Sequence, residues 1–416
     1  MTTTPTFVIV GGGLAGAKAA EALRAEGFDG HLVLVGAEPH RPYERPPLSK
    51  EYLQGAAGED KLFVHPAEWY TDQRVDLRVG TTVTGIDRPA HRLLTGDGDR
   101  LRYDRLLLAT GSSPRRLGVP GADLDGVRYL RSLDDSDRLR AAFVPGARVV
   151  VIGAGWIGLE TAAAARAAGC EVTVLERAEL PLLNVLGPQV ARVFADLHRR
   201  HGVDLRCGVS VADLFPAADT RSVGGVRLGD GSRIGSDVVV VGVGVTPNAD
   251  LARAGGLTVD DGVTVDAALR SSDPDIFAAG DVANAYHPFL GRHVRVEHWA
   301  TALHQPAVAA KAMLGQSATY DRLPYFFTDQ YDLGMEYTGY VAPGDHDEVV
   351  VRGDVDGLEF VAFWLRDSHV LAGMNVNVWD AKGPVTQLIR SRVRVDTARL
   401  ADVDVPLDEL TGGQLG

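Results

Sequence analysis

A pattern that occurs twice in the sequence limits the folds open to this chain. An apolar run leads into a Gly-rich turn, an Ala-rich segment, a single Gly and a second apolar run. The first copy reads TFVIVGGGLAGAKAAEALRAEG and HLVLVGAE, and the second reads ARVVVIGAGWIGLETAAAARAAG and CEVTVLER. Continuous apolar runs suit strands buried on both faces of a parallel sheet. Gly27 and Gly169 are placed to end the helices between them, so each copy predicts a βαβ unit.

Each Gly-rich turn has the spacing G-x-G-x-x-G and directly follows an expected strand. The glycines are Gly11, Gly13 and Gly16 in the first copy and Gly153, Gly155 and Gly158 in the second. In this pattern the first Gly allows the tight turn, the second lets a pyrophosphate approach the backbone, and the third lets the helix pack closely on the strand. The amides at the helix N-terminus then face the phosphates. A bare Gly turn is the alternative for one loop alone, but the full pattern, present twice, predicts two dinucleotide sites.

An acidic residue follows the second apolar run of each copy. Glu38 and Glu176 are suited to accept hydrogen bonds from ribose hydroxyls. A carboxylate repels a 2′-phosphate, so Glu176 favours NADH over NADPH at the second site. Arg177 follows it directly and could partly reverse that preference.

The rest of the chain extends this plan. The runs RLLLATGSSPR (Arg105 to Arg115), VVVVGVGVTPN (Val238 to Asn248) and DIFAAGDVA (Asp275 to Ala283) each predict a strand that ends in a Gly turn. From about Leu323 onward aromatic residues become denser, and EVVVRGDV and LEFVAFWL have strand character. The fold class predicted is α/β, with two Rossmann-like dinucleotide-binding domains and a carboxy-terminal α+β domain.

Composition excludes several classes of function. The chain has 42 basic and 55 acidic residues, a net charge of −13, which disfavours nucleic-acid binding. Its two cysteines cannot supply a disulfide scaffold or a four-cysteine iron–sulfur site. The twelve histidines show no metal-ligand spacing, so no metal site is expected. Because no apolar run is long enough to span a membrane and Met1 to Pro5 lack a basic signal region, we expect a cytoplasmic protein with no membrane contact.

Two dinucleotide sites in one chain indicate an electron relay. A nicotinamide needs an acceptor for its hydride, and a tightly held flavin is such an acceptor. We therefore expect one resident flavin and one exchanging nicotinamide dinucleotide.

Further motifs in this order resemble those of the oxygenase-coupled ferredoxin reductases, which share the glutathione-reductase fold. They are the two Gly loops, RPYERPPLSK (Arg41 to Lys50), LLLATGSSPR, GVGVTPN, DIFAAGDVA, VEHWATALHQ (Val296 to Gln305) and DQYD. The resemblance covers nearly the whole chain. It implies an FAD-binding domain at 1–114 and 246–321, an NAD(H)-binding domain at 115–245 and a carboxy-terminal domain at 322–416.

The resemblance also assigns roles to individual residues. Lys50 and Glu160 would be the catalytic pair, Lys50 beside the flavin and Glu160 facing the nicotinamide. The other implied FAD contacts are Arg45, Thr110, Gly111, Gly280, Asp281 and Trp299, and Gly244 is an implied NAD contact. Each has a simpler alternative: a solvated lysine for Lys50, an exposed first-turn carboxylate for Glu160, a turn cap for Asp281 and a core aromatic for Trp299.

Two features bear on the flavin and on the route of the electrons, and only the second departs from the family pattern. Disulfide reductases of this fold need thiols beside the flavin, but the segment PPLSK has Leu48 and Ser49 there. Where the family commonly has tryptophans, PYFFTDQ has Tyr325 and Phe327, so the shielding of the flavin ring differs. Electrons are therefore expected to leave toward an external carrier.

By resemblance that carrier is a 2Fe-2S ferredoxin that supplies a monooxygenase or a dioxygenase. Docking an acidic ferredoxin on an acidic chain needs a local basic patch. The candidates are Arg292 and Arg295, and the carboxy-terminal set Lys382, Arg390, Arg392 and Arg394. Two alternatives remain: a related flavoenzyme that reduces rubredoxin, quinone or oxygen, and a redox-sensing module like apoptosis-inducing factor.

Overall fold

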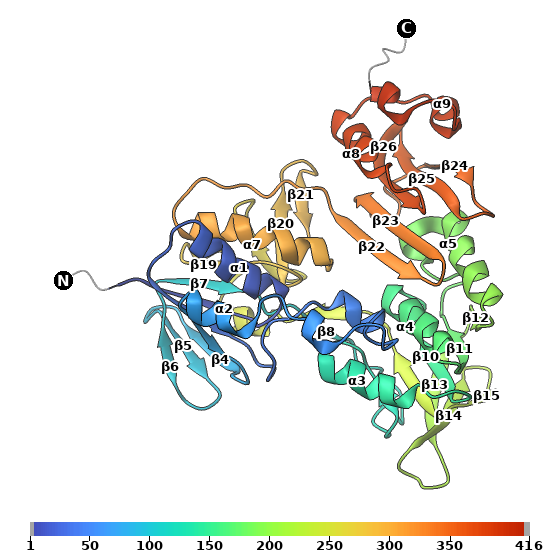
Figure 1. Cartoon of the computed structure of the whole chain (residues 1–416), viewed down its shortest axis with the longest axis horizontal. Coiled ribbons are helices and arrows are strands. Elements are labelled where there is room, and N and C mark those ends of the chain that lie inside the picture. The colour runs from blue at the N-terminus through green and yellow to red at the C-terminus, as the bar shows by residue number, and fades with distance from the viewer. Residues whose placement is uncertain (1–3, 412–416) are drawn as a thin grey trace. The chain divides into compact units, whose positions relative to one another are not determined.

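The computed structural model describes residues 4–411. Contacts divide the chain into two compact units, and each is built from separate stretches of sequence (Figure 1). The first unit comprises Met1–Pro46, Gly58–Ser113 and Val245–Arg322, and the second comprises Pro47–Ala57, Pro114–Gly244 and Leu323–Gly416.

The core of the first unit is a five-stranded parallel sheet. Its strands, in spatial order, are β19 (Ile276–Ala278), β7 (Arg105–Leu108), β1 (Thr6–Val10), β2 (His31–Val35) and β3 (Val75–Arg78). β1 is central and pairs in parallel with both β2 and β7. Its apolar side chains are almost fully buried, as a strand covered on both faces requires.

Helices and two small sheets complete the first unit. The helices are α1 (Leu14–Ala25), α2 (Ala67–Asp72), α6 (Asp250–Ala254) and α7 (Trp299–Met313), with a 3₁₀ turn η2 (Glu59–Lys61). Figure 1 shows α1 in blue beside α7 in orange, and these two helices pack on each other. One small sheet is the antiparallel β4 (Val83–Asp87), β5 (Arg92–Thr95) and β6 (Arg100–Arg102), and the other contains β18 (Val263–Val265), β20 (Ala283–His287) and β21 (Arg292–Val294).

The second unit repeats the parallel sheet. Its order is β12 (Asp204–Arg206), β11 (Glu171–Leu175), β10 (Arg148–Ile152), β16 (Val238–Val241) and β9 (Val127–Arg128). Helices α3 (Leu133–Ala142), α4 (Trp156–Ala167) and α5 (Leu183–Arg200) accompany it, together with the antiparallel β13 (Val211–Pro216), β14 (Val223–Leu228) and β15 (Arg233–Gly235). The 3₁₀ turn η1 (Pro46–Ser49) leads into the short segment that carries Lys50. A short strand pair, β8 (Ser112–Pro114) with β17 (Val245–Pro247), lies where the chain passes from one unit to the other.

The end of the described chain forms an antiparallel five-stranded sheet in the second unit. Its order is β22 (Tyr325–Gln330), β23 (Leu333–Gly339), β26 (His369–Val376), β25 (Glu359–Arg366) and β24 (Glu348–Asp354). Helix α8 (Lys382–Ser391) packs on β23 and β26, α9 (Thr397–Ala401) packs on β24, and η3 (Leu407–Thr411) follows. Strand β22 also packs against α4, which brings the edge of this sheet to the second glycine loop's helix.

The predicted fold class is confirmed. Both copies of the repeat form a strand, a glycine loop, a twelve-residue helix and a parallel strand. Gly27 and Gly169 follow the two helices with φ of 86° and 82°, a left-handed conformation that favours glycine. Within residues 4–411, no helix combines the length and the apolarity that crossing a membrane requires.

Candidate functional site

The first glycine loop joins β1 to α1, and its geometry requires glycine at two positions. Gly11 has a φ of +130°, and a Cβ there would lie 2.0 Å from the carbonyl oxygen of Ala109. A Cβ on Gly16 would lie 2.0 Å from the carbonyl oxygen of Gly11. Both glycines are therefore needed for the close approach of helix and strands.

Gly13 differs because nothing lies within 4 Å of the Cβ it lacks. The space in front of it is open, and α1 begins there without a side-chain cap. Backbone amides at an uncapped helix N-terminus attract an anion. The loop therefore fits the pyrophosphate of a dinucleotide.

The second loop, between β10 and α4, repeats this arrangement. Gly153 has a φ of +100°, and a Cβ there would lie 2.4 Å from the carbonyl oxygen of Gly242. A Cβ on Gly158 would lie 2.1 Å from the carbonyl oxygen of Gly153. Gly155 again faces open space, and α4 also begins without a side-chain cap. The second loop fits a pyrophosphate for the same reasons as the first.

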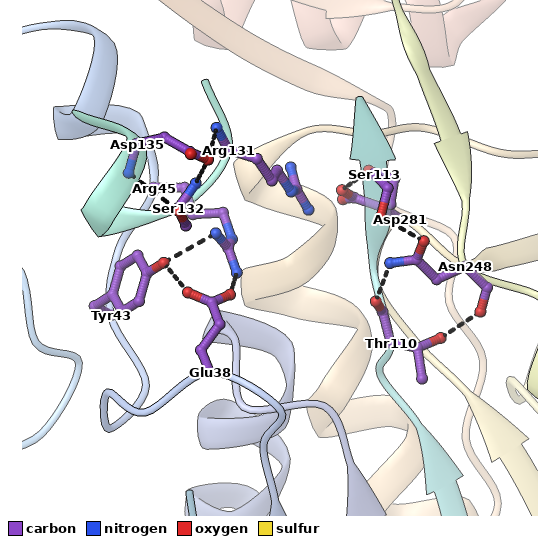
Figure 2. Close-up of polar contacts among 11 residues, drawn as sticks. Glu38, Tyr43, Arg45, Thr110, Ser113, Arg131, Ser132, Asp135, Asn248 and Asp281 are labelled. Carbon is purple, nitrogen blue, oxygen red and sulfur yellow. Dashed lines mark hydrogen bonds and ion pairs between the residues drawn. The ribbon is translucent and has the colours of Figure 1, made fainter. Parts of the chain in front are cut away.

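Glu38 lies three residues beyond the end of β2, in a polar cluster (Figure 2). Its carboxylate accepts a hydrogen bond from the Tyr43 hydroxyl and lies 2.6 Å from the Arg45 guanidinium. Arg45 also donates to the Tyr43 oxygen at 3.1 Å. Since a carboxylate can accept about four hydrogen bonds, Glu38 keeps capacity for ribose hydroxyls.

Glu176 directly follows β11 and is held by backbone groups instead. It accepts from the amide of Ala154 at 2.7 Å and from the amide of Ala178 at 2.8 Å. The first of these amides belongs to the second glycine loop itself. The carboxylate is thus fixed beside the loop, while the side chain of Arg177 is exposed.

A second polar cluster in the first unit surrounds the end of β7 (Figure 2). The Ser112 hydroxyl donates to the Asp281 carboxylate at 2.7 Å. Thr110 and Asn248 form a reciprocal pair, in which each side chain donates to the other's backbone carbonyl at 2.8 Å. The predicted residues Thr110 and Asp281 therefore lie among polar groups, and Ser112 ties Asp281 to the turn after β7.

The remaining predicted residues of the first unit are two glycines in turns and one tryptophan at a helix start. Gly111 and Gly280 have φ of +66° and +79°. The amide of Gly280 donates to the Gln305 side chain on α7 at 2.8 Å, which ties the Gly280 turn to that helix. Trp299 begins α7, and its indole N–H donates to the Glu44 carboxylate, whose pKa is raised by burial.

Lys50 and Glu160 form a buried ion pair in the second unit, 2.9 Å apart. Their side chains are 11% and 4% exposed, so the alternatives of a solvated lysine and an exposed first-turn carboxylate do not hold. Glu160 also accepts hydrogen bonds from Ser49 at 2.5 Å and from Thr328 at 2.6 Å. The Lys50 ammonium lies 5.4 Å from the centre of the Phe327 ring. Phe327, which stands where the family commonly has a tryptophan, therefore lies beside the Lys50–Glu160 ion pair.

The structure thus brings together two pairs of predicted residues, Glu38 with Arg45 and Lys50 with Glu160. Thr110 pairs instead with Asn248, which was not predicted as a site residue. Gly244 has a φ of +101°, and its carbonyl accepts from the Arg115 amide at 2.9 Å. Sequence reasoning missed the hydroxyl partners of the carboxylates, Tyr43, Ser49, Ser112 and Thr328. Tyr43, Ser49 and Ser112 lie in motifs quoted for the family resemblance, and Thr328 lies in PYFFTDQ. Nothing in these segments indicates which carboxylate each hydroxyl binds.

Neither cysteine has the character of a reactive thiol. Burial raises the pKa of the Cys170 and Cys207 thiols, so both favour the protonated form. Within residues 4–411, no three His, Cys, Asp or Glu side chains are grouped as a metal ion would require.

Comparison with known proteins adds two family matches. The pyridine nucleotide-disulphide oxidoreductase family model matches residues 5–306, and the reductase C-terminal model matches residues 325–411. The chain is 44% identical over 405 residues to the ferredoxin–NAD⁺ reductase component of the anthranilate 1,2-dioxygenase system of Burkholderia cepacia, covering 96% of this chain and 98% of that one.

Among the solved structures that are similar to this chain, two cover 98% of it. The reductase in the covalent putidaredoxin reductase–putidaredoxin complex has a TM-score of 0.94 at 38% identity, and 98% of each chain is covered. The ferredoxin reductase for the CYP199A2 system from Rhodopseudomonas palustris has a TM-score of 0.93 at 37% identity, covering 98% of this chain and 100% of that one.

Proposed function

Because the chain belongs to the pyridine nucleotide-disulphide oxidoreductase family, we propose that it is an FAD-dependent reductase that passes electrons from NADH to a 2Fe-2S ferredoxin. The ferredoxin would supply a monooxygenase or a dioxygenase. In support, one relative of this chain is named as the reductase component of a dioxygenase system, and one similar structure is named as the ferredoxin reductase for the CYP199A2 system. The observation that carries the proposal is the presence of two open, uncapped glycine loops in one chain. The two unpaired thiols also fit work in the reducing cytoplasm.

The first loop would hold FAD in a domain formed by residues 1–114 and 246–321. Its open turn at Gly13 would bind the pyrophosphate, and Glu38 would accept from the adenosine ribose. Asp281 would accept from a ribitol hydroxyl. The remaining groups in this assignment are Gly11, Gly16, Arg45, Thr110, Gly111, Gly280 and Trp299.

The second loop would bind NADH in a domain of residues 115–245, followed by the carboxy-terminal domain of residues 322–416. Its open turn at Gly155 would bind the pyrophosphate. The other glycines assigned to this site are Gly153, Gly158 and Gly244. The Glu176 carboxylate, fixed by two amides, would accept from a free ribose 2′-hydroxyl and repel a 2′-phosphate. This favours NADH over NADPH.

When bound, FAD supplies the step from a two-electron donor to a one-electron acceptor, because it can take up a hydride and release electrons singly. Lys50 would place a positive charge where the reduced ring becomes negative. Glu160 would keep Lys50 in position and face the nicotinamide. The chain offers no thiol in PPLSK, so neither a disulfide nor a thiol adduct would intervene between flavin and carrier.

Single-turnover reduction of different carriers tests this function. The flavin, reduced with one equivalent of NADH without oxygen, should reduce a 2Fe-2S ferredoxin at least tenfold faster than rubredoxin, quinone or oxygen. A faster rate with another carrier would contradict the ferredoxin assignment. A long-lived charge-transfer band with negligible reduction of every carrier would instead favour a redox-sensing module.

The ferredoxin would dock on a basic patch of this acidic chain. Arg295 is the weaker candidate, because its side chain is 9% exposed and pairs with Asp261 at 3.1 Å and with Glu297. Arg292 is exposed, as are the carboxy-terminal candidates Lys382, Arg390, Arg392 and Arg394. Lys382 lies over the ring of Tyr325, with 3.5 Å between its ammonium and the ring centre.

Charge reversal at Arg292 tests this surface. Arg292→Glu should slow ferredoxin reduction by about tenfold at low salt, while reduction of ferricyanide by NADH stays unchanged. Equal losses in the two assays would contradict a docking role, since ferricyanide reduction needs no ferredoxin surface.

A further inference from the structure

A chain of polar side chains, three buried and one half-buried, extends away from Glu160 inside the second unit. It consists of Thr328 and Gln330 on β22, His198 on α5, and Tyr331 just after β22, and is called here the polar chain. Thr328 and Gln330 are each 1% exposed, and His198 is 0% exposed. Burying polar groups is costly unless they are hydrogen-bonded, so the hydrogen bonds of these side chains indicate the role of the polar chain.

The direction of the first hydrogen bonds follows from the donor and acceptor inventory. An ionised Glu160 can only accept, so the Thr328 hydroxyl, at 2.6 Å, must donate its single hydrogen to it. Thr328 can then only accept from Gln330, at 3.1 Å. Gln330 must therefore direct its NH₂ group toward Thr328 and its carbonyl oxygen away.

The same logic fixes the next link. The carbonyl oxygen of Gln330 lies 2.9 Å from Nε2 of His198, so Nε2 must carry the hydrogen. A neutral imidazole protonated at Nε2 accepts at Nδ1, and the Tyr331 hydroxyl lies 3.5 Å from that atom. Each donor from Tyr331 to Thr328 thus points toward Glu160.

His198 is suited to this role because it is neutral. Burial, first, and the nearby His201 lower its pKa, while the hydrogen bond to Gln330 raises it, and the result is about 4. A neutral imidazole has one donor and one acceptor, which lets it continue a directional chain.

We propose that the polar chain positions Glu160 by delivering an aligned hydrogen bond to its carboxylate, so that Glu160 in turn holds Lys50 in place. This inference rests on the proposed function, in which Lys50 stabilises the reduced flavin. Thr328, Gln330 and His198 are positioning residues: Thr328 touches Glu160 directly, and the other two act through Thr328. Aligned hydrogen bonds polarise one another, so the last donor is strengthened by those behind it.

The test is the tautomer of His198, measured by ¹⁵N NMR on the oxidised holoprotein with labelled histidine. The wild type should show a single neutral form protonated at Nε2. Thr328→Val removes the hydroxyl at nearly constant volume, which frees Gln330 to turn over and should give a mixture of the two tautomers. Thr328→Ser, the matched control, keeps the hydroxyl and should retain the single form.

A second variant tests where the direction is set. Tyr331→Phe removes the hydroxyl at the far end and should leave the Nε2–H form unchanged, because Gln330 still requires it. A wild-type His198 protonated at Nδ1 would overturn the proposal without any variant. An unchanged single tautomer in Thr328→Val would overturn it as well.

The functional consequence is measured in the same proteins. Thr328→Val should slow reduction of the bound flavin by saturating NADH on the order of tenfold, the effect of losing one hydrogen bond to a buried charge, while Thr328→Ser restores it. Equal rates in the two variants would contradict the positioning role. The tautomer measurement needs neither NADH nor ferredoxin, so it tests the polar chain independently of the proposed function. If NADH did not reduce the flavin of the wild type, the proposed function would be wrong, and the tautomer of His198 would still decide the role of the polar chain.

Discussion

The two glycine loops have nearly the same backbone and different side chains around it. Gly13 and Gly155 begin twelve-residue helices with φ of −95° and −80° and ψ of −171° and −179°. Two residues beyond the last loop glycine, however, α1 has Lys18 and α4 has Glu160. Lys18 pairs with Glu21 on its own helix, whereas Glu160 is buried against Lys50.

The acidic residues after the loops differ in the same sense. Glu38 is held by the side chains of Tyr43 and Arg45, and Glu176 by the backbone amides of Ala154 and Ala178. Under the proposed function, the shared backbone binds a dinucleotide in each unit, and the side chains around it determine what is done with that dinucleotide. Four experiments test whether the two loops differ in this way.

The largest effects are expected at the first glycine of each loop. Gly11→Ala and Gly153→Ala put a Cβ within 2.0 Å and 2.4 Å of a carbonyl oxygen at positive φ, which should cost about 3 kcal/mol or more of folding free energy. Gly11→Ala should also abolish flavin binding, while Gly153→Ala protein that folds should keep its flavin. Thermal unfolding and flavin content measure both effects.

The second glycines are the matched controls. Gly13→Ala and Gly155→Ala meet nothing within 4 Å, so both should fold like the wild type. The first should lose FAD and the second should raise the KM for NADH. If both variants lost FAD, or if both raised the KM for NADH, the two loops would not have different roles.

The polar chain behind the second loop should make the protein less stable in acid. The folded-state pKa of His198 is about 4, below its unfolded value of about 6.5, so between these values the unfolded state binds the extra proton. Stability should therefore fall as pH decreases from 6.5 to 4, by at most about 3 kcal/mol from this residue.

Chemical unfolding at a series of pH values measures this slope. His198→Gln should make the slope shallower, while the control His31→Gln, whose side chain is 52% exposed, should leave it unchanged. An identical slope in His198→Gln and wild type would show that His198 does not titrate as a buried neutral group.

Residues at matching positions on α1 and α4 should differ in their effect on chemistry. Glu160→Gln removes the charge that holds Lys50 and should slow flavin reduction by NADH about a hundredfold, the scale of losing a preorganised electrostatic contact. Lys18→Met should change the rate less than twofold. Stopped-flow absorbance of the flavin gives both rates. A similar decrease in the rate of flavin reduction in the two variants would contradict a difference in role between α1 and α4.

The smallest effect concerns the choice of nicotinamide. Glu176→Ala removes the carboxylate that would bind the ribose and repel a 2′-phosphate, so the preference for NADH over NADPH should fall about tenfold. The ratio of kcat/KM for the two substrates measures it. Glu38→Ala should leave that ratio unchanged in whatever fraction retains flavin.

Sequence predicted the loops well because their requirements are local. A tight turn at Gly11 or Gly153 depends on its own φ and on the strand beside it, so spacing alone reveals it. The partners of Glu160 are different, because Ser49 and Thr328 lie 111 and 168 residues from it along the chain. Only tertiary packing selects such partners, and no periodicity encodes them.

The same limit explains Arg295. Its residue type suggested a docking cation, but the fold encloses it between two carboxylates of the first unit. The pairing of Lys50 with Glu160 came only from the family resemblance. Its polar chain was not expected at all, since a buried histidine and glutamine have no distinguishing spacing.

The proposed function requires a flavin that NADH reduces and a ferredoxin oxidises. An anaerobic titration followed by visible absorbance measures both steps directly. One equivalent of NADH should bleach one tightly bound FAD, and two equivalents of oxidised 2Fe-2S ferredoxin should restore the flavin spectrum, because each accepts a single electron. Protein that cannot be loaded with FAD, or whose reduced flavin persists in the presence of excess ferredoxin, would contradict the account.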